Sequence, residues 1–262
     1  MTTQLLFYAN AVPVNPGSHK DIYVKTGTDY GFAHTASSVP LTAAEFPLAA
    51  SEYAIVFAGN EDSVFPVVIL GGEKDQNLYL DDAGKWTARY IPAFVRRYPF
   101  VFAQTGTENR LTLCIDEGFV GCNKEGRGER LFDSDGERTA YLEQVLNFQK
   151  AYQLQHQRTL AFCKKLKELD LLQPVQATLN QQSGERRVLG GLQVVNRAKL
   201  KELDAEKVIE MLRSDELETI FLHLHSLVNL RVIGERMPQH ADDTAPAPEI
   251  APEEDGAELT KH

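Results

Sequence analysis

Arginine and aromatic residues gather in one short stretch of the sequence, residues 86–98. This stretch contains three arginines, two tyrosines and the only tryptophan of the chain. A guanidinium group donates paired hydrogen bonds to a carboxylate or a phosphate, and it also stacks on aromatic rings. The stretch therefore predicts a site for a carboxylate, a phosphate or a peptide terminus. The predicted ligand-binding residues in it are Trp86, Arg89, Tyr90, Arg96, Arg97 and Tyr98.

Two acidic residues, Asp116 and Glu117, follow the strand-like run 111–115 and complete the predicted ligand-binding set. Adjacent residues on a strand point to opposite faces, so this pair is a poor catalytic dyad, and no catalytic residue is predicted. The alternative hypothesis is an enzyme that modifies a peptide or small molecule at a strand end. It would use one of these acids together with Arg89 or Arg97.

A purely structural interpretation competes with the binding site. Arg96 and Arg97 could end a short helix and pair with its carbonyl groups and with the two acids. Trp86, Tyr90 and Phe94 have the spacing of core residues. The sequence alone leaves both interpretations open.

Motifs for metals and cofactors are absent from the sequence. His223 and His225 are two residues apart, whereas helical zinc sites use a spacing of four. Cys114 and Cys122 do not match a CxxC zinc pattern. The sequence has no GxGxxG, GxxxxGK[ST] or GxSxG motif. We therefore predict no metal and no cofactor.

The composition indicates a globular protein that does not bind nucleic acid. The formal net charge is −10, of which −6 belongs to residues 239–262. Three cysteines and the lack of a basic, apolar start favour reduced thiols and a cytoplasmic location. No apolar run approaches the ~20 residues of a membrane span. The partner expected from the cluster is a protein, a peptide or a small acidic ligand, and the sequence does not indicate an oligomeric state.

The pattern of predicted strands and helices around these residues indicates an α+β fold. Short, mainly antiparallel strands fill a β-rich region, 1–137, and helices fill 138–238, which also contains a hairpin at 175–195. These regions could form one domain or two. Residues 239–262 form an acidic tail rich in proline and alanine, which we expect to be disordered.

Local signals predict individual elements. Strands are expected at 4–8, 21–25, 53–59, 64–72, 77–91, 100–104 and 111–115, with a turn at Gly84. Thr42 and Glu45 fit a capping box. Residues 93–98 form a helical turn between two X-Pro breaks, and Thr139 caps one long helix or two successive ones. Asn196, Asp204 and Ser214 or Asp215 start three later helices.

Five segments in this order resemble the bacterial SapC family: 39–57, 86–103, 111–117, 131–137 and 186–203. One departure is Asn196, where relatives place an acid, and it affects only a helix cap. The family name links the resemblance to a surface layer, which conflicts with the missing signal segment. The resemblance also implies that relatives act as companions of outer-membrane uptake receptors and of flavin-dependent halogenase-like or cupin-like proteins. The cluster without acid–base or metal companions predicts a non-catalytic soluble binding protein, and the resemblance implies an accessory role connected with outer-membrane nutrient uptake. A surface-layer protein, as the family name suggests, is a further alternative.

Overall fold

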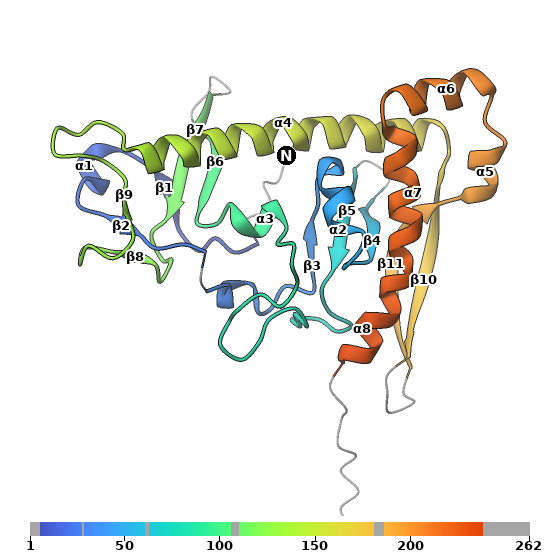
Figure 1. Cartoon of the computed structure of the whole chain (residues 1–262), viewed down its shortest axis with the longest axis horizontal. Coiled ribbons are helices and arrows are strands. Elements are labelled where there is room, and N and C mark those ends of the chain that lie inside the picture. Colours follow the sequence, from blue (N-terminus) through green and yellow to red (C-terminus); the bar gives the residue numbers. More distant parts are fainter. Residues whose placement is uncertain (1–5, 28, 61–62, 106–109, 181–185, 238–262) are drawn as a thin grey trace, which may run out of the picture.

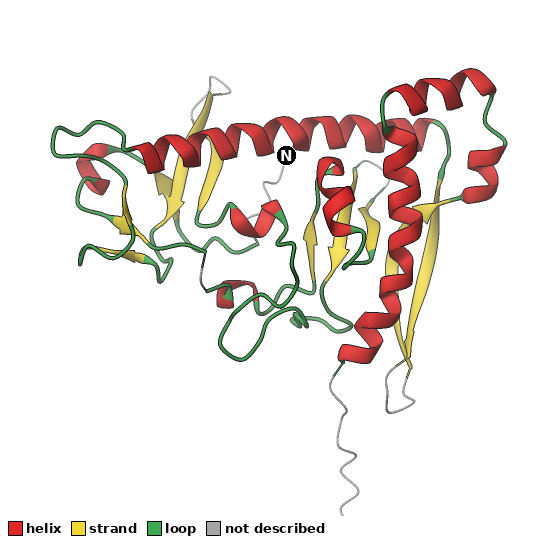
Figure 2. Cartoon of the chain, viewed as in Figure 1, coloured by secondary structure: helices red, strands yellow, loops and turns green. Residues whose placement is uncertain are grey.

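Antiparallel sheets and helices share the structure, a computed structural model that describes residues 6–27, 29–60, 63–105, 110–180 and 186–237. Strands dominate the first half of the chain and helices the second half, which confirms the predicted α+β class (Figure 2). Every named strand pair is antiparallel. The predicted acidic tail, 239–262, lies outside the described residues.

The described residues form three sheets. The first has the order β1 (Ala11–Pro13), β7 (Arg110–Asp116), β6 (Phe100–Thr105). The second has the order β10 (Leu172–Asn180), β11 (Arg186–Val195), β4 (Ile55–Gly59), β5 (Val64–Ile69), β3 (Ser38–Pro40). The third is small, with the order β8 (Cys122–Asn123), β2 (Tyr23–Val24), β9 (Glu129–Arg130).

The predicted hairpin, β10 and β11, joins the five-stranded sheet. Leu192 and Gln193 of β11 pair with Ala58 and Phe57 of β4. The hairpin begins at Leu172, earlier than predicted, and includes Pro174. Proline is tolerated there because β10 is an edge strand. The helical half of the sequence thus contributes two strands to the sheet of the first half.

Helix α4 (Ala140–Glu168) runs along the longest axis of the molecule (Figure 1). Thr139 caps it by accepting a hydrogen bond from the Leu142 N–H, and the helix is a single continuous one. It packs against β5 and β6 and against the 3-10 turn η2 (Ala43–Glu45). Its buried face includes polar residues such as Gln149. The Gln149 amide donates hydrogen bonds to two backbone carbonyl groups, and these bonds make its burial possible.

Short helices connect and cover the sheets. Four come early in the chain: α1 (Pro16–His19), η1 (Gly31–Ala33), α2 (Phe46–Ala49) and α3 (Ala93–Arg96). Five follow the hairpin: α5 (Arg197–Lys201), α6 (Ala205–Arg213), α7 (Glu216–Ser226), η3 (Leu227–Asn229) and α8 (Leu230–Arg236). Helix α7 packs against β4, β11 and α2, and α8 packs against β10 (Figure 1). No helix in the described ranges is long and apolar enough to cross a membrane.

Two strand predictions are wrong. The strand predicted at 4–8 begins outside the described residues. Residues 6–8 are not a strand, and the first strand among the described residues is β1. The run 77–91 contains only an isolated bridge between Leu80 and Trp86, around the predicted turn at Gly84. Local hydrogen bonds replace a ladder in this run, since the Asn77 side chain binds both the Tyr79 N–H and the Ala33 carbonyl.

Candidate functional site

A buried carboxylate holds the segment that carries the predicted site. Glu45 is 6% exposed, and its Oε2 accepts hydrogen bonds at 2.8 Å from the backbone N–H and the hydroxyl of Thr42, which confirms the capping box. Its Oε1 accepts hydrogen bonds at 2.7 Å from the Tyr90 hydroxyl and from the Ala93 N–H. Glu45 therefore fixes the start of α3 and the preceding Tyr90 in one arrangement. Burial, together with this carboxylate, raises the pKa of Tyr90.

The two consecutive arginines at the end of the one-turn helix α3 lie in different environments. Arg97 is 8% exposed, and its Cζ lies 4.2 Å from the ring centroid of Phe94 and 4.9 Å from that of Tyr152. Arg96 is exposed at the surface. Stacking on two rings stabilises the interior guanidinium, while the outer one remains accessible to a ligand.

Arg96 is held in a defined orientation although it is exposed. Its Nε donates to the Ile91 carbonyl at 2.9 Å, and its Nη2 lies 3.4 Å from the Tyr90 hydroxyl oxygen. Its Cζ lies 5.7 Å from the ring centroid of Tyr90 and 5.3 Å from that of Phe148 on α4. Within the described ranges, no carboxylate lies at ion-pair distance from Arg96. We call Tyr90, Arg96 and Phe148 the Arg96 platform.

The third arginine, Arg89, already has a carboxylate partner. Its side chain is 86% exposed, and its Nε lies 3.3 Å from Oε1 of Glu52. Its backbone N–H donates to the other oxygen of Glu52 at 2.8 Å. Of the two exposed arginines in the segment, Arg96 is therefore the one without a counterion among the described residues.

Trp86 and Tyr98 lie in the interior, below this surface. Trp86 is 4% exposed, and its indole N–H donates to the Tyr53 hydroxyl at 2.7 Å. Tyr98 is 7% exposed and donates to Oδ2 of Asp116 at 3.3 Å. Burial and this carboxylate raise the pKa of Tyr98. Both side chains support the segment from within the fold.

Asp116 and Glu117 point in different directions, as expected at a strand end. Asp116 is fully buried, and each of its oxygens accepts two hydrogen bonds: Oδ1 from the N–H groups of Asn10 and Gly118, and Oδ2 from the Ala9 N–H and the Tyr98 hydroxyl. Glu117 is half-exposed, and its Oε1 lies 3.3 Å from Nε2 of His19. Asp116 thus anchors the N-terminal segment to β7, and the structure does not bring the two acids together around one reacting atom.

Comparison with known families decides where the chain belongs. The SapC family model matches residues 14–233, from directly after β1 into α8. The chain belongs to the SapC family. The match contains all eight predicted ligand-binding residues of this SapC protein. Neither the curated proteins nor the solved structures contain a match to it.

Two residues that shape the candidate site of this SapC protein were not predicted. Phe148 supplies one side of the Arg96 platform from α4, and Glu45 orients Tyr90 from the capped turn. The capping box signalled that Glu45 binds locally, but it gave no sign of the bonds to Tyr90 and Ala93. Nothing in the sequence indicated that Phe148 contacts Arg96, because this contact depends on how α4 packs relative to α3.

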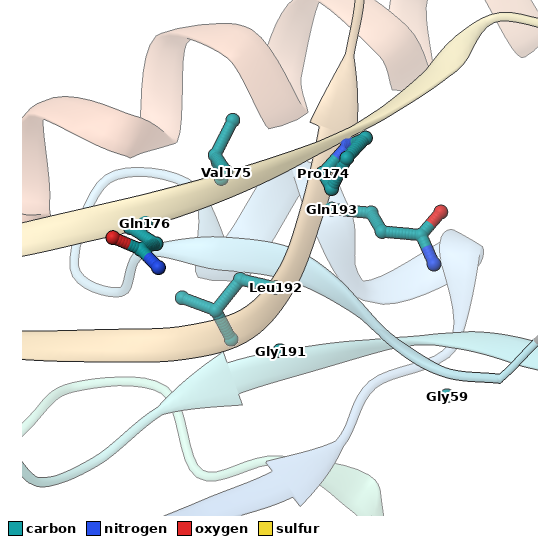
Figure 3. A pocket seen from close by; sticks show the side chains of 7 residues that line it. All are labelled: Gly59, Pro174, Val175, Gln176, Gly191, Leu192 and Gln193. Carbon is teal, nitrogen blue, oxygen red and sulfur yellow. The ribbon is translucent and has the colours of Figure 1, made fainter.

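Two depressions on the described surface lie away from the Arg96 platform. One, of about 320 Å³, lies where β10 and β11 meet β4, and it is lined by Gly59, Pro174, Val175, Gln176, Gly191, Leu192 and Gln193 (Figure 3). The other, of about 490 Å³, lies along α6 and is lined by Glu206, Ile209, Glu210, Arg213 and Ser214. Neither includes a predicted ligand-binding residue.

Metal-binding side chains do not converge in the described part of this SapC protein. No group of three or more histidine, cysteine or acidic residues there could hold a metal ion. His223 is buried, and its ring binds backbone groups of β4 and β11. His225 is exposed on the other side of α7. The thiol of Cys122 has its pKa raised to about 11 by burial and by Asp116 and Glu117, so this cysteine is a poor nucleophile at neutral pH.

Proposed function

We propose that this SapC protein is a non-catalytic binding protein that holds a ligand carboxylate on the Arg96 platform. The ligand is a peptide or protein partner or a small acidic metabolite, and these share the carboxylate as the recognised group. One observation carries the proposal: the guanidinium of Arg96 lies at the surface beside two aromatic rings, is oriented by the Ile91 carbonyl, and has no carboxylate at ion-pair distance among the described residues.

The hydrogen bonds around Arg96 support recognition of a planar anion. Nε is used by the Ile91 carbonyl, and one Nη2 hydrogen is directed at the Tyr90 hydroxyl. That hydroxyl donates its own hydrogen to Glu45, so its lone pairs accept from Arg96. The outer edge of the guanidinium, with Nη1, can then form paired hydrogen bonds with a carboxylate.

The aromatic rings beside Arg96 favour a ligand that also has an apolar part. Tyr90 and Phe148 are only partly buried, so each ring offers area for contact. An acidic peptide or a carboxylate with a carbon chain satisfies both features, whereas an inorganic anion satisfies only one. The implied connection of relatives with outer-membrane uptake receptors supports a role in nutrient uptake, which we include in the proposal together with a cytoplasmic location.

A binding assay with defined carboxylates tests the proposal. The probes are an array of short peptides, each as a free acid and as a C-terminal amide, and the small acids succinate and citrate in calorimetry. We expect wild-type protein to bind at least one of these carboxylates, and Arg96→Gln to lower its affinity about tenfold or more, since a charged hydrogen bond contributes about 1.5–3 kcal/mol. Arg96→Lys should restore only part of the affinity, because lysine lacks the planar fork.

Arg89→Gln is the matched control, because it removes a nearby exposed arginine that already has Glu52 as its partner. It should leave the affinity within about twofold of wild type. Urea denaturation, followed by Trp86 fluorescence, checks that both variants are folded. The proposal fails if no carboxylate probe binds the wild type, or if both arginine variants bind equally well.

A further inference from the structure

A continuous stripe of exposed side chains runs along the outer face of α7, η3 and α8. Its members follow one another at steps of three and four residues, which places them on one side of the helical segment. They are Glu218, Phe221, His225, Val228 and Arg231, and all five are exposed. We call these five residues the α7–α8 stripe. The segment runs beside the β10–β11 hairpin, in orange and red in Figure 1.

The opposite side of the same segment faces the core. Ile220, His223, Ser226 and Asn229 are buried there. Ser226 accepts a hydrogen bond from the Ile55 N–H, and the Asn229 amide donates to the carbonyl groups of Ala50 and Tyr53. The orientation of the segment is thus fixed by buried polar bonds. Consequently, the stripe is a rigid feature of the surface.

Two large apolar side chains are exposed on the stripe. Phe221 is 47% exposed and Val228 is 61% exposed. They lie about two turns apart on the same face, and partly buried leucines, Leu217 and Leu224, lie beside them. An apolar face of this kind on a fixed helix is typical of a surface that packs against another helix.

The order of residues on the stripe is self-complementary. From one end it reads acidic, apolar, histidine, apolar, basic, so that reversing it places an acid opposite a base and an apolar residue opposite an apolar residue. We propose that the α7–α8 stripe binds a second copy of this chain, with the two segments antiparallel about a twofold axis. Glu218 of one copy faces Arg231 of the other, Phe221 faces Val228, and the two His225 side chains meet near the axis.

The charges of the stripe are compatible with this arrangement. Arg231 forms an ion pair with Glu235 on the same helix at 3.1 Å, and its side chain is 80% exposed. An exposed pair of this kind contributes little to stability, so Arg231 can also bind Glu218 of the second copy. A twofold dimer requires one patch to complement itself, and a patch for an unrelated partner has no such requirement.

The expected dimer is weak. Each copy contributes two exposed apolar side chains, one acidic and one basic side chain, so the buried area is small for a specific interface. We expect a dissociation constant on the order of tens of micromolar. The stripe does not include any residue of the Arg96 platform, so dimerisation and carboxylate binding are separate properties and can fail separately.

Sedimentation velocity of the full chain over a range from about 5 to 200 μM tests the proposal. Wild type should shift from monomer to dimer over this range. Val228→Glu should keep the protein monomeric throughout. Val188→Glu is the matched control, because Val188 on β11 is 60% exposed, close to the 61% of Val228, and lies outside the stripe. It should dimerise as wild type does.

A charge exchange tests the antiparallel pairing itself. Glu218→Arg and Arg231→Glu should each weaken dimerisation at least tenfold, because like charges then meet. The double variant should recover an affinity within about threefold of wild type. If wild-type protein stays monomeric at the highest concentration, the proposal is wrong. The stripe would then have to bind another partner, such as the acidic residues 239–262 of the same chain. Equal dimerisation of the two valine variants, or a double variant that is not rescued, also overturns it.

Discussion

The Oε1 atom of Glu45 and the hydroxyl of Tyr90 form a 2.7 Å hydrogen bond that joins a capped turn to the segment carrying Arg96. The same oxygen accepts from the Ala93 N–H at the start of α3. One carboxylate thus sets the geometry of two elements that lie far apart in the sequence. The orientation of Arg96 depends on this bond, because the Tyr90 hydroxyl and ring both contact the guanidinium.

Replacing Glu45 by alanine should destabilise the protein by about 3–5 kcal/mol. The substitution leaves the N–H groups of Thr42 and Ala93 and the Tyr90 hydroxyl without their acceptor, and unpaired buried polar groups are costly. Urea denaturation measures the change in unfolding free energy. Glu125→Ala is the control, since Glu125 is 67% exposed and pairs only at the surface with Arg127. It should cost about 0.5 kcal/mol or less. Equal costs for the two variants would contradict the anchoring role of Glu45.

Acidic pH should weaken the attachment of α7 to the five-stranded sheet. Nδ1 of His223 lies 2.9 Å from the Ile55 carbonyl, and Nε2 accepts from the Val195 N–H at 3.1 Å, so the ring is neutral with its hydrogen on Nδ1. Burial lowers the pKa of His223 to about 4, below its usual value of 6.5. The folded state therefore binds fewer protons than the unfolded state between these values. The stabilisation is complete above pH 6.5 and is lost as the pH falls from 6.5 towards 4.

The expected loss is about 3 kcal/mol in unfolding free energy across this pH range, because one pKa unit corresponds to about 1.4 kcal/mol. Urea denaturation at pH 7 and pH 4.5 measures it. His223→Gln should be less stable than wild type at pH 7, and the difference should narrow by about 2 kcal/mol at pH 4.5. His225→Gln, on the exposed face of α7, should retain the pH dependence of wild type. A constant difference between wild type and His223→Gln at both pH values would contradict the prediction.

Close packing of α8 on β10 should make Gly234 intolerant of a side chain. A Cβ atom at Gly234 would lie 2.4 Å from the Asn180 carbonyl oxygen. Alanine normally favours a helix over glycine by about 1 kcal/mol, so destabilisation by Gly234→Ala would show that the steric conflict dominates. We expect a net loss of about 1–3 kcal/mol in unfolding free energy and faster hydrogen exchange in α8.

Gly190→Ala is the control for this substitution, because a Cβ atom at Gly190 would meet nothing within 4 Å. It should leave the stability unchanged or raise it by about 0.5 kcal/mol. If Gly234→Ala were as stable as wild type, α8 would have to be able to move away from β10.

The sequence was sufficient for elements with strong local signals. Thr139 and Asn196 both cap the helices predicted from them, and the Thr42 and Glu45 capping box is present. Residues 77–91 misled the prediction, because their strand-like residue types are held by side-chain bonds such as those of Asn77. Whether an apolar run forms a ladder depends on a partner strand, and a single run does not reveal that partner.

The predicted site was limited by the same lack of tertiary information. Arg96 and Arg97 are adjacent and chemically identical, so residue type could not show that one lies under α4 and the other at the surface. Their separation follows from the position of α3 relative to Tyr152 and Phe148, two residues of α4. Ligand binding by the predicted residues remains a prediction. Of these residues, Tyr90 and Arg96 are the two that belong to the Arg96 platform.

The bonds that fix Arg96 have a consequence for the thermodynamics of recognition. A long charged side chain normally gives up about 2 kcal/mol of rotamer entropy when a ligand immobilises it. The Ile91 carbonyl and the two flanking rings restrict that motion before any ligand arrives. Part of this rotamer entropy is therefore already lost in the folded protein, so a carboxylate binds with a smaller entropic penalty than it would at a mobile arginine. Even a small acid could therefore be retained on an open surface.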